Sequence, residues 1–194
     1  MNYKDRVKLF EAELDLIFNK EIKEFTKECI KQAPDYVFTD CPSSSTGKYH
    51  PIDEISGDGT VLHSRRVTAV AYDVCRALGC EDHRDEIIAS SILHDMAKQG
   101  LEKSGNTTKN HPQTMAKLVA DVYVEKFKDK LDRESALIIY NCIFYHYGLW
   151  SSPDIKKDLK NYTFEELCVY ISDYIVSKRF VRVDCKRNSN VIEI

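Results

Sequence analysis

The chain has 194 residues, 43% of them hydrophobic and 30% charged, which is the balance of one ordinary globular domain. Its net charge of −3 argues against non-specific binding to duplex DNA, and no apolar run approaches the roughly 20 residues that a bilayer span needs. The seven cysteines are odd in number and form no CxxC pair, so we expect neither a disulfide framework nor a cysteine-rich zinc module.

The amino-terminal part predicts a helical segment followed by a long loop. Apolar residues such as Val7, Phe10 and Leu14 recur at helical spacing between residues 4 and 32, which predicts one long helix or two shorter ones. The charged start lacks the apolar stretch of a signal peptide, so we expect a cytoplasmic protein. Residues 33–60 contain prolines, glycines and a run of serines, and they predict a loop of unusual length.

Helical periodicity returns at His63 and continues through most of the remaining chain. Gly79 closes the first of these helices, as a glycine after a helix often does, and His111-Pro112 opens a later one. From Val181 the tail could form a short strand or stay extended. The predicted helices cover residues 63–78, 84–97, 111–129, 132–147 and 163–180, with a polar loop at 100–110 and a turn at 148–153.

This order of elements predicts an all-α fold with a single helical bundle. We expect residues 1–54 to form an amino-terminal helix and loop that pack on a core of residues 55–182. Residues 183–194 would then be a carboxy-terminal tail.

The dipeptide His94-Asp95 follows the apolar run 87–93, so it is expected at the end of a buried helix. A buried carboxylate without a partner is costly, and a bound cation removes that cost. Asp173 is embedded in a second apolar helix, and His63 begins another. Two imidazoles and two carboxylates together suit a divalent metal ion with positions open for water and substrate.

The order His63, His94-Asp95, Asp173 resembles the H…HD…D pattern of the HD-domain superfamily of metal-dependent phosphohydrolases. The surrounding segments, Val61–Val67, Ser90–Lys98 and Ile171–Arg179, are also similar to those of that family. The resemblance spans about residues 55–182 and implies an HD-type helical bundle with these four residues as metal ligands. The segment Lys48-Tyr49-His50-Pro51 resembles a phage and bacterial subgroup of the family.

The resemblance also implies roles for further residues. Some subfamilies bind a second metal ion through histidines at the places of His111 and His146, although these could instead cap a helix and pack among aromatic rings. Asp95 would orient the attacking water, and Lys98 would contact phosphate unless it is an ordinary solvated lysine. The residues expected to contact substrate are Lys48, His50 and Arg66, with Arg65 as the alternative arginine.

Two further patterns have open interpretations. Gly47-Lys48 is superficially similar to a phosphate-binding loop, but Pro42 and Tyr49 do not fit the Walker pattern, so we reject that interpretation. The aromatic residues Tyr147 and Trp150, with Tyr145 beside them, could stack a nucleobase or belong to the core.

The function implied is hydrolysis of a nucleotide or other small phosphate ester by metal-activated water. A phosphodiesterase or nuclease acting on cyclic nucleotides or single strands is the alternative, and a non-catalytic metal-binding regulatory module is a third. The ligand types fit one or two ions of Mn, Fe, Co, Ni or Zn, with Mg as a further candidate. We expect a small phosphorylated partner, no membrane and no duplex DNA, and the chain is compatible with a homo-oligomer.

Overall fold

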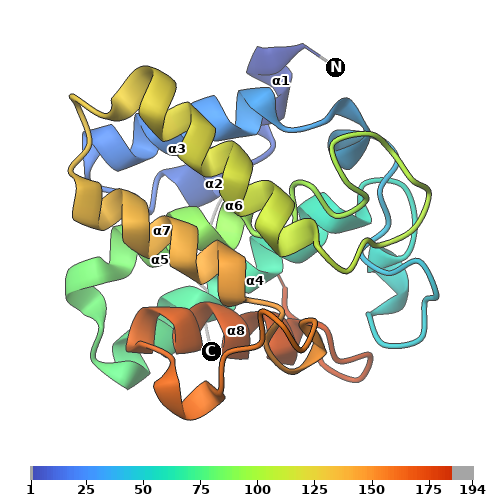
Figure 1. Cartoon of the computed structure of the whole chain (residues 1–194). Helices are drawn as coiled ribbons and strands as arrows, with labels where there is room; N and C mark the ends of the chain where they lie inside the picture. Colours follow the sequence, from blue (N-terminus) through green and yellow to red (C-terminus); the bar gives the residue numbers. More distant parts are fainter. Residues whose placement is uncertain (1, 185–194) are drawn as a thin grey trace.

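A computed structural model describes residues 2–184, and the regular secondary structure of this part of the chain is all helical with no β-strand (Figure 1), which confirms the predicted all-α class. Short 3-10 turns connect the helices, and two of them, η1 (Asp35–Phe38) and η2 (Ile52–Glu54), lie within the predicted long loop. The α-helices are α1 (Tyr3–Lys8), α2 (Glu11–Leu14), α3 (Lys20–Gln32), α4 (Gly59–Leu78), α5 (Arg84–Leu93), α6 (His111–Val122), α7 (Arg133–Tyr145) and α8 (Phe164–Val176).

The amino-terminal segment forms three helices, so the expectation of one or two was wrong. The break before α3 is stabilised by Asp85, whose Oδ2 accepts hydrogen bonds from the backbone N–H groups of Phe18 at 2.9 Å and Asn19 at 2.5 Å. The Asn19 side chain in turn accepts from the N–H groups of Glu21 and Ile22, which caps the first turn of α3. This contact with Asp85 of α5 therefore fixes where α3 begins, and the local periodicity of the sequence does not indicate it.

Several helix ends also differ from the prediction. Helix α4 begins at Gly59, so His63 lies in its second turn instead of opening it. Helix α5 ends at Leu93 and not at residue 97, and α8 ends at Val176 and not at 180. Residues 181–184 form no regular structure, and the rest of the predicted tail lies outside the described residues.

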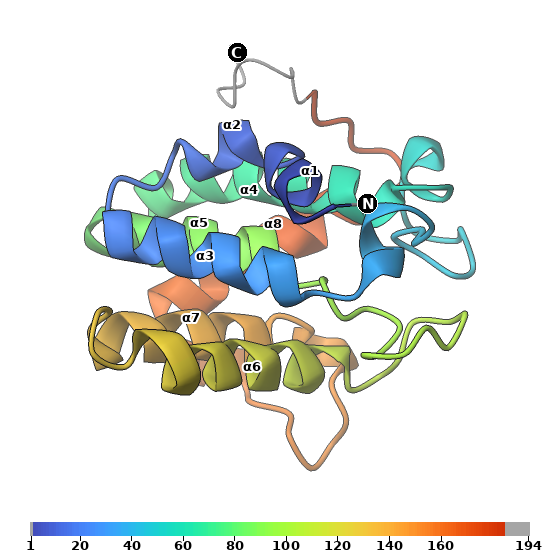
Figure 2. The same ribbon diagram turned by 90° about the horizontal axis from the view of Figure 1, so that it is seen from above.

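The helices form three layers around α5 (Figure 2). Helices α6 and α7 lie on one side, α3, α5 and α8 in the middle, and α1, α2 and α4 on the other side. Helix α5 packs against α2, α3, α4, α7 and α8, and all its residues from Ile87 to Leu93 are buried. The hydrophobic core therefore surrounds the helix that leads directly to His94.

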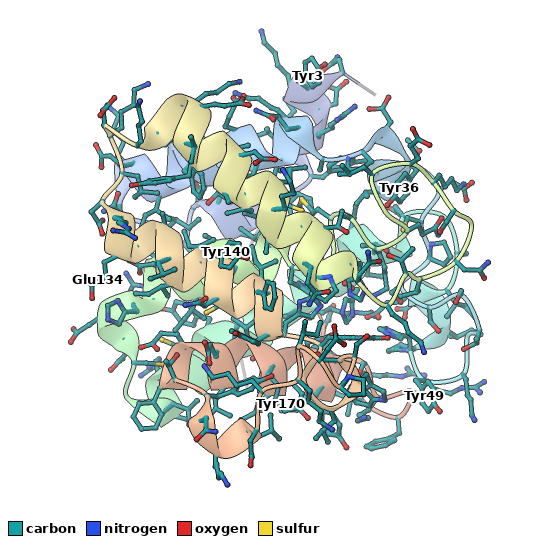
Figure 3. All side chains as sticks on the ribbon, in the orientation of Figure 1. Tyr3, Tyr36, Tyr49, Glu134, Tyr140 and Tyr170 are labelled. Atoms are coloured by element: carbon teal, nitrogen blue, oxygen red, sulfur yellow. The ribbon has the colours of Figure 1, made fainter. Side chains whose placement is uncertain are left out.

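Two long loops, between α3 and α4 and between α5 and α6, meet at one end of the bundle (Figure 1). Tyr36 of η1, labelled in Figure 3, joins them: its hydroxyl donates to the Gly100 carbonyl at 2.6 Å and accepts from the Gln99 N–H at 2.9 Å. Helix α5 ends and helices α4 and α6 begin at this end of the molecule. The fold thus gathers helix termini and long loops in one place.

Two further expectations concerned membrane-spanning helices and the state of the cysteines. Among the described residues, no helix combines the length and the apolar character that crossing a membrane would require. The six cysteines of the described part are free and buried. Cys185 lies outside the described residues.

Candidate metal centre

Five helices or their ends bring the six predicted metal ligands together. His63 comes from the second turn of α4, and His94 is the residue that caps the carboxyl end of α5, with Asp95 directly after it. The other three are His111, the first residue of α6; His146, which follows the end of α7; and Asp173, within α8. All six side chains are buried except that of Asp173, which is partly accessible.

The first group of ligand atoms surrounds one oxygen of Asp173 and one of Asp95. The Nε2 atom of His63 lies 2.9 Å from Asp173 Oδ1 and 3.8 Å from Asp95 Oδ2. The Nε2 atom of His94 lies 4.0 Å and 3.5 Å from the same two oxygens. Two imidazole nitrogens and two carboxylate oxygens therefore point into one small space.

The second group surrounds the other oxygen of Asp95. Its Oδ1 atom lies 3.0 Å from His111 Nε2 and 3.6 Å from His146 Nε2, and these two nitrogens are 3.3 Å apart. The Asp95 carboxylate thus stands between the two groups, with one oxygen turned to each. The two oxygens of Asp95 therefore belong to two different clusters of imidazole nitrogens.

Three of the histidine rings are oriented by a backbone carbonyl. The Nδ1 atoms of His94, His111 and His146 lie 2.6–2.8 Å from the carbonyl oxygens of Ser91, Thr108 and Ile143, each three residues earlier in the chain. A carbonyl can only accept, so each Nδ1 carries a proton, and in the neutral form of such a ring the lone pair is on Nε2. At the ends of α5 and α7 these carbonyls have no partner further along the helix, which is why a histidine there can use them.

The unprotonated nitrogens need a partner that the described side chains do not provide. His94 Nε2 is buried and makes no hydrogen bond within residues 2–184. His111 and His146 direct two such nitrogens toward each other, although neither neutral ring has a proton left to share. Convergent imidazole lone pairs beside carboxylates are the ligands of a divalent transition metal, so the residues present fit such an ion.

The charges around the centre change the pKa values of its carboxyl groups and of His63. Burial alone would raise the pKa of Asp95, but Lys98, His94 and His111 hold it well below the ordinary value. Burial would lower the pKa of His63, whereas the hydrogen bonds that its ring donates to Asp173 and Glu54 raise it to about 9. In the absence of a cation, His63 therefore keeps an extra proton among these carboxylates.

Lys98 lies beside this centre and is buried, with its ammonium in contact with Asp95 Oδ2. Burial would lower its pKa, but the charges of Asp95 and Asp173 raise it. The residue is therefore a buried cation within the centre and not an ordinary solvated lysine, even though α5 ends before it is reached.

The three residues expected to contact substrate differ in their surroundings. Lys48 is exposed and its ammonium lies over the Tyr49 ring, 5.3 Å from the centroid. The His50 ring packs edge-on against His63, with centroids 4.8 Å apart. Both residues come from the long loop that precedes α4.

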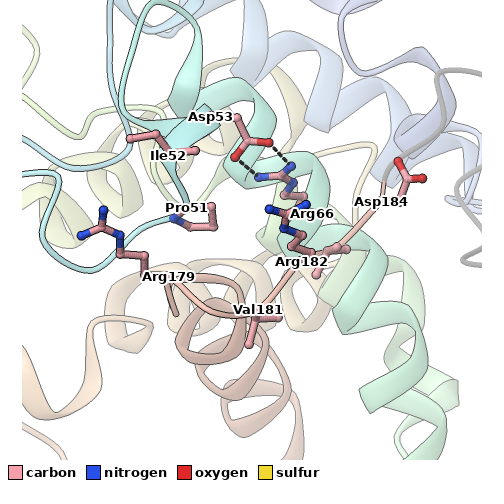
Figure 4. A pocket seen from close by; sticks show the side chains of 9 residues that line it. Pro51, Ile52, Asp53, Arg66, Arg179, Val181, Arg182 and Asp184 are labelled. Carbon is pink, nitrogen blue, oxygen red and sulfur yellow. Dashed lines mark hydrogen bonds and ion pairs between the residues drawn. The ribbon is translucent and has the colours of Figure 1, made fainter.

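Arg66 is held by two carboxylates of η2. It donates to Asp53 at 2.6 and 2.9 Å and to Glu54 at 2.7 Å. Figure 4 shows the pair with Asp53 at the edge of a cavity of about 710 Å³, which Arg179 and Arg182 also line. The six predicted metal ligands are absent from the described lining of that cavity.

Glu54 belongs to the centre but was not predicted from the sequence. Its side chain is fully buried, and Oε2 lies 3.1 Å from His63 Nδ1 and 3.0 Å from His50 Nδ1. No spacing rule in the sequence marks it, because Asp53-Glu54 reads as two ordinary polar residues of a loop.

An aromatic cluster leads from the centre to the surface. The Tyr147 ring lies 4.8 Å from the His111 ring and 6.3 Å from that of Trp150, which stacks on Tyr174 at 5.8 Å and 26°. Trp150 is 50% exposed and Tyr174, the neighbour of Asp173, is 40% exposed. Of the three rings predicted here, Tyr145 turns instead toward Tyr162 and Phe144.

Comparison with known proteins finds one family. The HD domain family matches residues 60–177, which is more than half of the chain and includes all six predicted ligands. Neither the search of the curated proteins nor that of the solved structures finds a match. The match agrees with the resemblance carried by His63, His94-Asp95 and Asp173. The chain therefore belongs to the HD domain family, whose members are metal-dependent phosphohydrolases that bind divalent metals.

Proposed function

We propose that this protein hydrolyses a phosphate ester or anhydride bond of a nucleotide. The observation that carries the proposal is the convergence of four histidine Nε2 atoms on the carboxylates of Asp95 and Asp173. A binding module with a structural metal would need a closed set of four ligands, whereas this centre offers six side chains and a partly accessible carboxylate.

The side chains divide into two ligand sets. His63, His94, Asp95 and Asp173 would hold one divalent ion, and Asp95 with His111 and His146 would hold a second. Imidazole with carboxylate suits Mn, Fe, Co, Ni or Zn, and Mg, which prefers oxygen ligands, suits the set less well. Such an ion supplies Lewis acidity that activates water and neutralises charge on phosphoryl oxygens.

The protein's own groups would prepare the site for that chemistry. The Asp95 carboxylate, held between two pairs of imidazoles, would orient the attacking water. The buried ammonium of Lys98 would stabilise negative charge that develops on the phosphoryl group, where the low dielectric strengthens the attraction. Lys48 and His50, on the adjoining loop, would contact the phosphate chain. The pairing of Arg66 with Asp53 and Glu54 favours a structural role for that residue.

The aromatic cluster supports a nucleotide over a simple phosphate ester. Tyr147 contacts His111, and Trp150 and Tyr174 continue from it toward solvent. A base held by these rings would lie a short distance from a phosphate at the metal centre, and every base has a face that can stack. The stacked pair also carries the Lys178 ammonium, 3.4 Å from the centroid of Tyr174.

The test is the release of phosphate, pyrophosphate or triphosphate from a panel of nucleotides in the presence of Mn, Co, Ni, Zn or Mg. We expect metal-dependent turnover that is lost in Asp95→Ala and kept in Asp121→Ala, a change at an exposed carboxylate of α6. The released fragment would identify the bond. Absence of turnover on every mononucleotide by protein that binds metal would contradict the proposal and favour cyclic dinucleotides or single-stranded nucleic acid.

A further inference from the structure

Both oxygens of the Glu54 carboxylate have hydrogen-bond partners. Its Oε2 atom lies 3.0 Å from His50 Nδ1, 3.1 Å from His63 Nδ1 and 3.3 Å from Ser43 Oγ, and Oε1 accepts from Arg66 at 2.7 Å. The backbone is fixed as well, since the Glu54 carbonyl accepts from the N–H of Ser43 at 2.8 Å. This carboxylate is thus held rigidly against two histidine rings.

His50, Glu54 and His63 are close enough to suggest a separate cation site. That interpretation requires the lone pair of His63 Nδ1. The same ring, however, presents Nε2 to Asp173 and Asp95 at the main centre, at 2.9 and 3.8 Å. A neutral imidazole has one lone pair for a ligand, and its other nitrogen carries a proton. If Nε2 binds the ion at the main centre, Nδ1 must donate to Glu54.

His63 differs in this respect from the other three histidines. His94, His111 and His146 donate Nδ1–H to a backbone carbonyl three residues earlier. His63 lies inside α4, where the carbonyl three residues earlier already belongs to the helical hydrogen-bond ladder. A side chain from outside the helix must therefore accept its proton. A carboxylate does this more strongly than a carbonyl and increases the basicity of the ligating nitrogen.

We propose that Glu54 is a positioning residue for the metal centre: it fixes the tautomer and orientation of His63 so that Nε2 is free to bind the divalent ion. This inference rests on the proposed assignment of His63 as a metal ligand. Arg66 pairs with Glu54 through one guanidinium nitrogen and separately with Asp53. The loop before α4 is on this account part of the metal centre and not only a cover over it.

Asp53 provides a matched control for Glu54. Both carboxylates lie in η2 and both pair with Arg66, but among the described contacts only Glu54 reaches a histidine. The experiment measures the binding of Mn²⁺ and Co²⁺ to metal-free wild type, Glu54→Gln and Asp53→Asn by titration calorimetry, with circular dichroism to verify folding. We expect Glu54→Gln to weaken binding by about 10- to 100-fold and Asp53→Asn by less than about threefold.

The outcomes separate this inference from the proposed function. Wild type that binds no divalent ion would overturn both. Wild type that binds metal, with Glu54→Gln binding equally well, would overturn only the role of Glu54. Equal weakening in both variants would mean that η2 acts by anchoring Arg66, which also contradicts the inference.

A measurement on the wild type avoids the risk that Glu54→Gln fails to fold. In Zn²⁺-loaded protein with ¹⁵N-labelled histidine, long-range ¹H–¹⁵N correlation spectra distinguish the two ring nitrogens. We expect the assigned His63 ring to carry its proton on Nδ1, with Nε2 bound to zinc. A proton on Nε2, or zinc bound through Nδ1, would overturn the inference, and a purely structural Glu54 would not determine which nitrogen is protonated.

Discussion

The direction of each imidazole ring is decided by what its Nδ1 atom can reach. His94 and His146 sit at the carboxyl ends of helices, where backbone carbonyls lack helical partners, and they take those carbonyls as acceptors. His63 sits within a helix and takes Glu54. The choice of acceptor thus follows from the position of the residue in its helix, and every ring directs Nε2 toward the two carboxylates.

A substitution at Trp150 tests whether the aromatic cluster binds a base. Replacing Trp150 with alanine removes a half-exposed ring next to Tyr147 and Tyr174. Stacking of a base on an aromatic side chain contributes about 1–3 kcal/mol, so we expect KM for nucleotides to rise by roughly 5- to 150-fold. Turnover of ribose 5-phosphate, which has no base, should change little.

The control is Phe164→Ala, which removes an exposed ring at the amino end of α8, the end opposite to Tyr174. Trp150 is the only tryptophan of the chain, so quenching of its fluorescence by a nucleotide also reports binding in the wild type. Similar losses on nucleotide and on ribose 5-phosphate would mean that Trp150 supports the fold of the site and does not bind the base.

The motif residues could be predicted from the sequence, whereas Glu54 could not. His63, His94, Asp95 and Asp173 stand out because each is a polar residue within or directly after an apolar stretch of the sequence. Glu54 has no such context, and its burial arises only when the loop folds back over the start of α4. The sequence also does not indicate which groups accept the Nδ1 protons of the histidines, because these acceptors depend on where each helix ends.

At the scale of elements, the ends of helices are both the least predictable and the most important features. The periodicity around Ile92 extends past His94, yet α5 ends at Leu93. Beyond it the chain continues in tighter turns, with the N–H of Met96 bonded to the Leu93 carbonyl and that of Lys98 to the Asp95 carbonyl. These turns keep Lys98 beside Asp95, although the helix that was expected to continue to residue 97 ends before it.

A substitution at Gly59 tests the contact between η2 and α4. A Cβ atom on Gly59 would lie 1.9 Å from the Glu54 carbonyl oxygen, so Gly59→Ala must push η2 away from the helix. We expect the free energy of unfolding to fall by about 1–3 kcal/mol and metal binding to weaken, because the Glu54 carboxylate moves with its backbone. Urea denaturation and titration with Mn²⁺ measure the two effects.

Gly79→Ala is the matched control, since it lies at the opposite end of the same helix. Its φ of +68° makes alanine strained there, but no atom lies within 4 Å of the added Cβ. It should reduce stability by about 1 kcal/mol and leave metal affinity unchanged. Unaltered metal affinity in Gly59→Ala would show that the position of η2 does not matter to the centre.

At the scale of the whole molecule, the amino-terminal segment and the HD core share one interior. The family match begins at residue 60, but Phe10, Phe25 and Ile30 belong to the same buried cluster as Ile88 and Met115. The sequence predicted that residues 1–54 pack on the core, as the amphipathic pattern of α3 suggested. Periodicity shows that a helix has an apolar face but not which partner covers it, so this packing could only be expected.

Phe25 provides the test of this shared interior. It is fully buried and contacts Phe127 edge-to-face, with ring centroids 5.2 Å apart. Phe25→Ala should reduce the free energy of unfolding by about 3–5 kcal/mol, the usual cost of a large cavity. If the molecule is one cooperative unit, Trp150 fluorescence and far-ultraviolet circular dichroism should report the same urea midpoint in the wild type, and both midpoints should fall together in the variant.

The control is Phe18→Ala, in the same segment, where a 73% exposed ring contacts only Arg84 among the interactions described, and the expected loss is below about 1 kcal/mol. Trp150 follows α7, far along the chain from Phe25. A dichroism transition at low urea with an unchanged Trp150 midpoint would mean that residues 1–54 unfold separately. Coincident shifts would instead mean that Glu54, and with it the orientation of His63, is maintained by the stability of the entire fold.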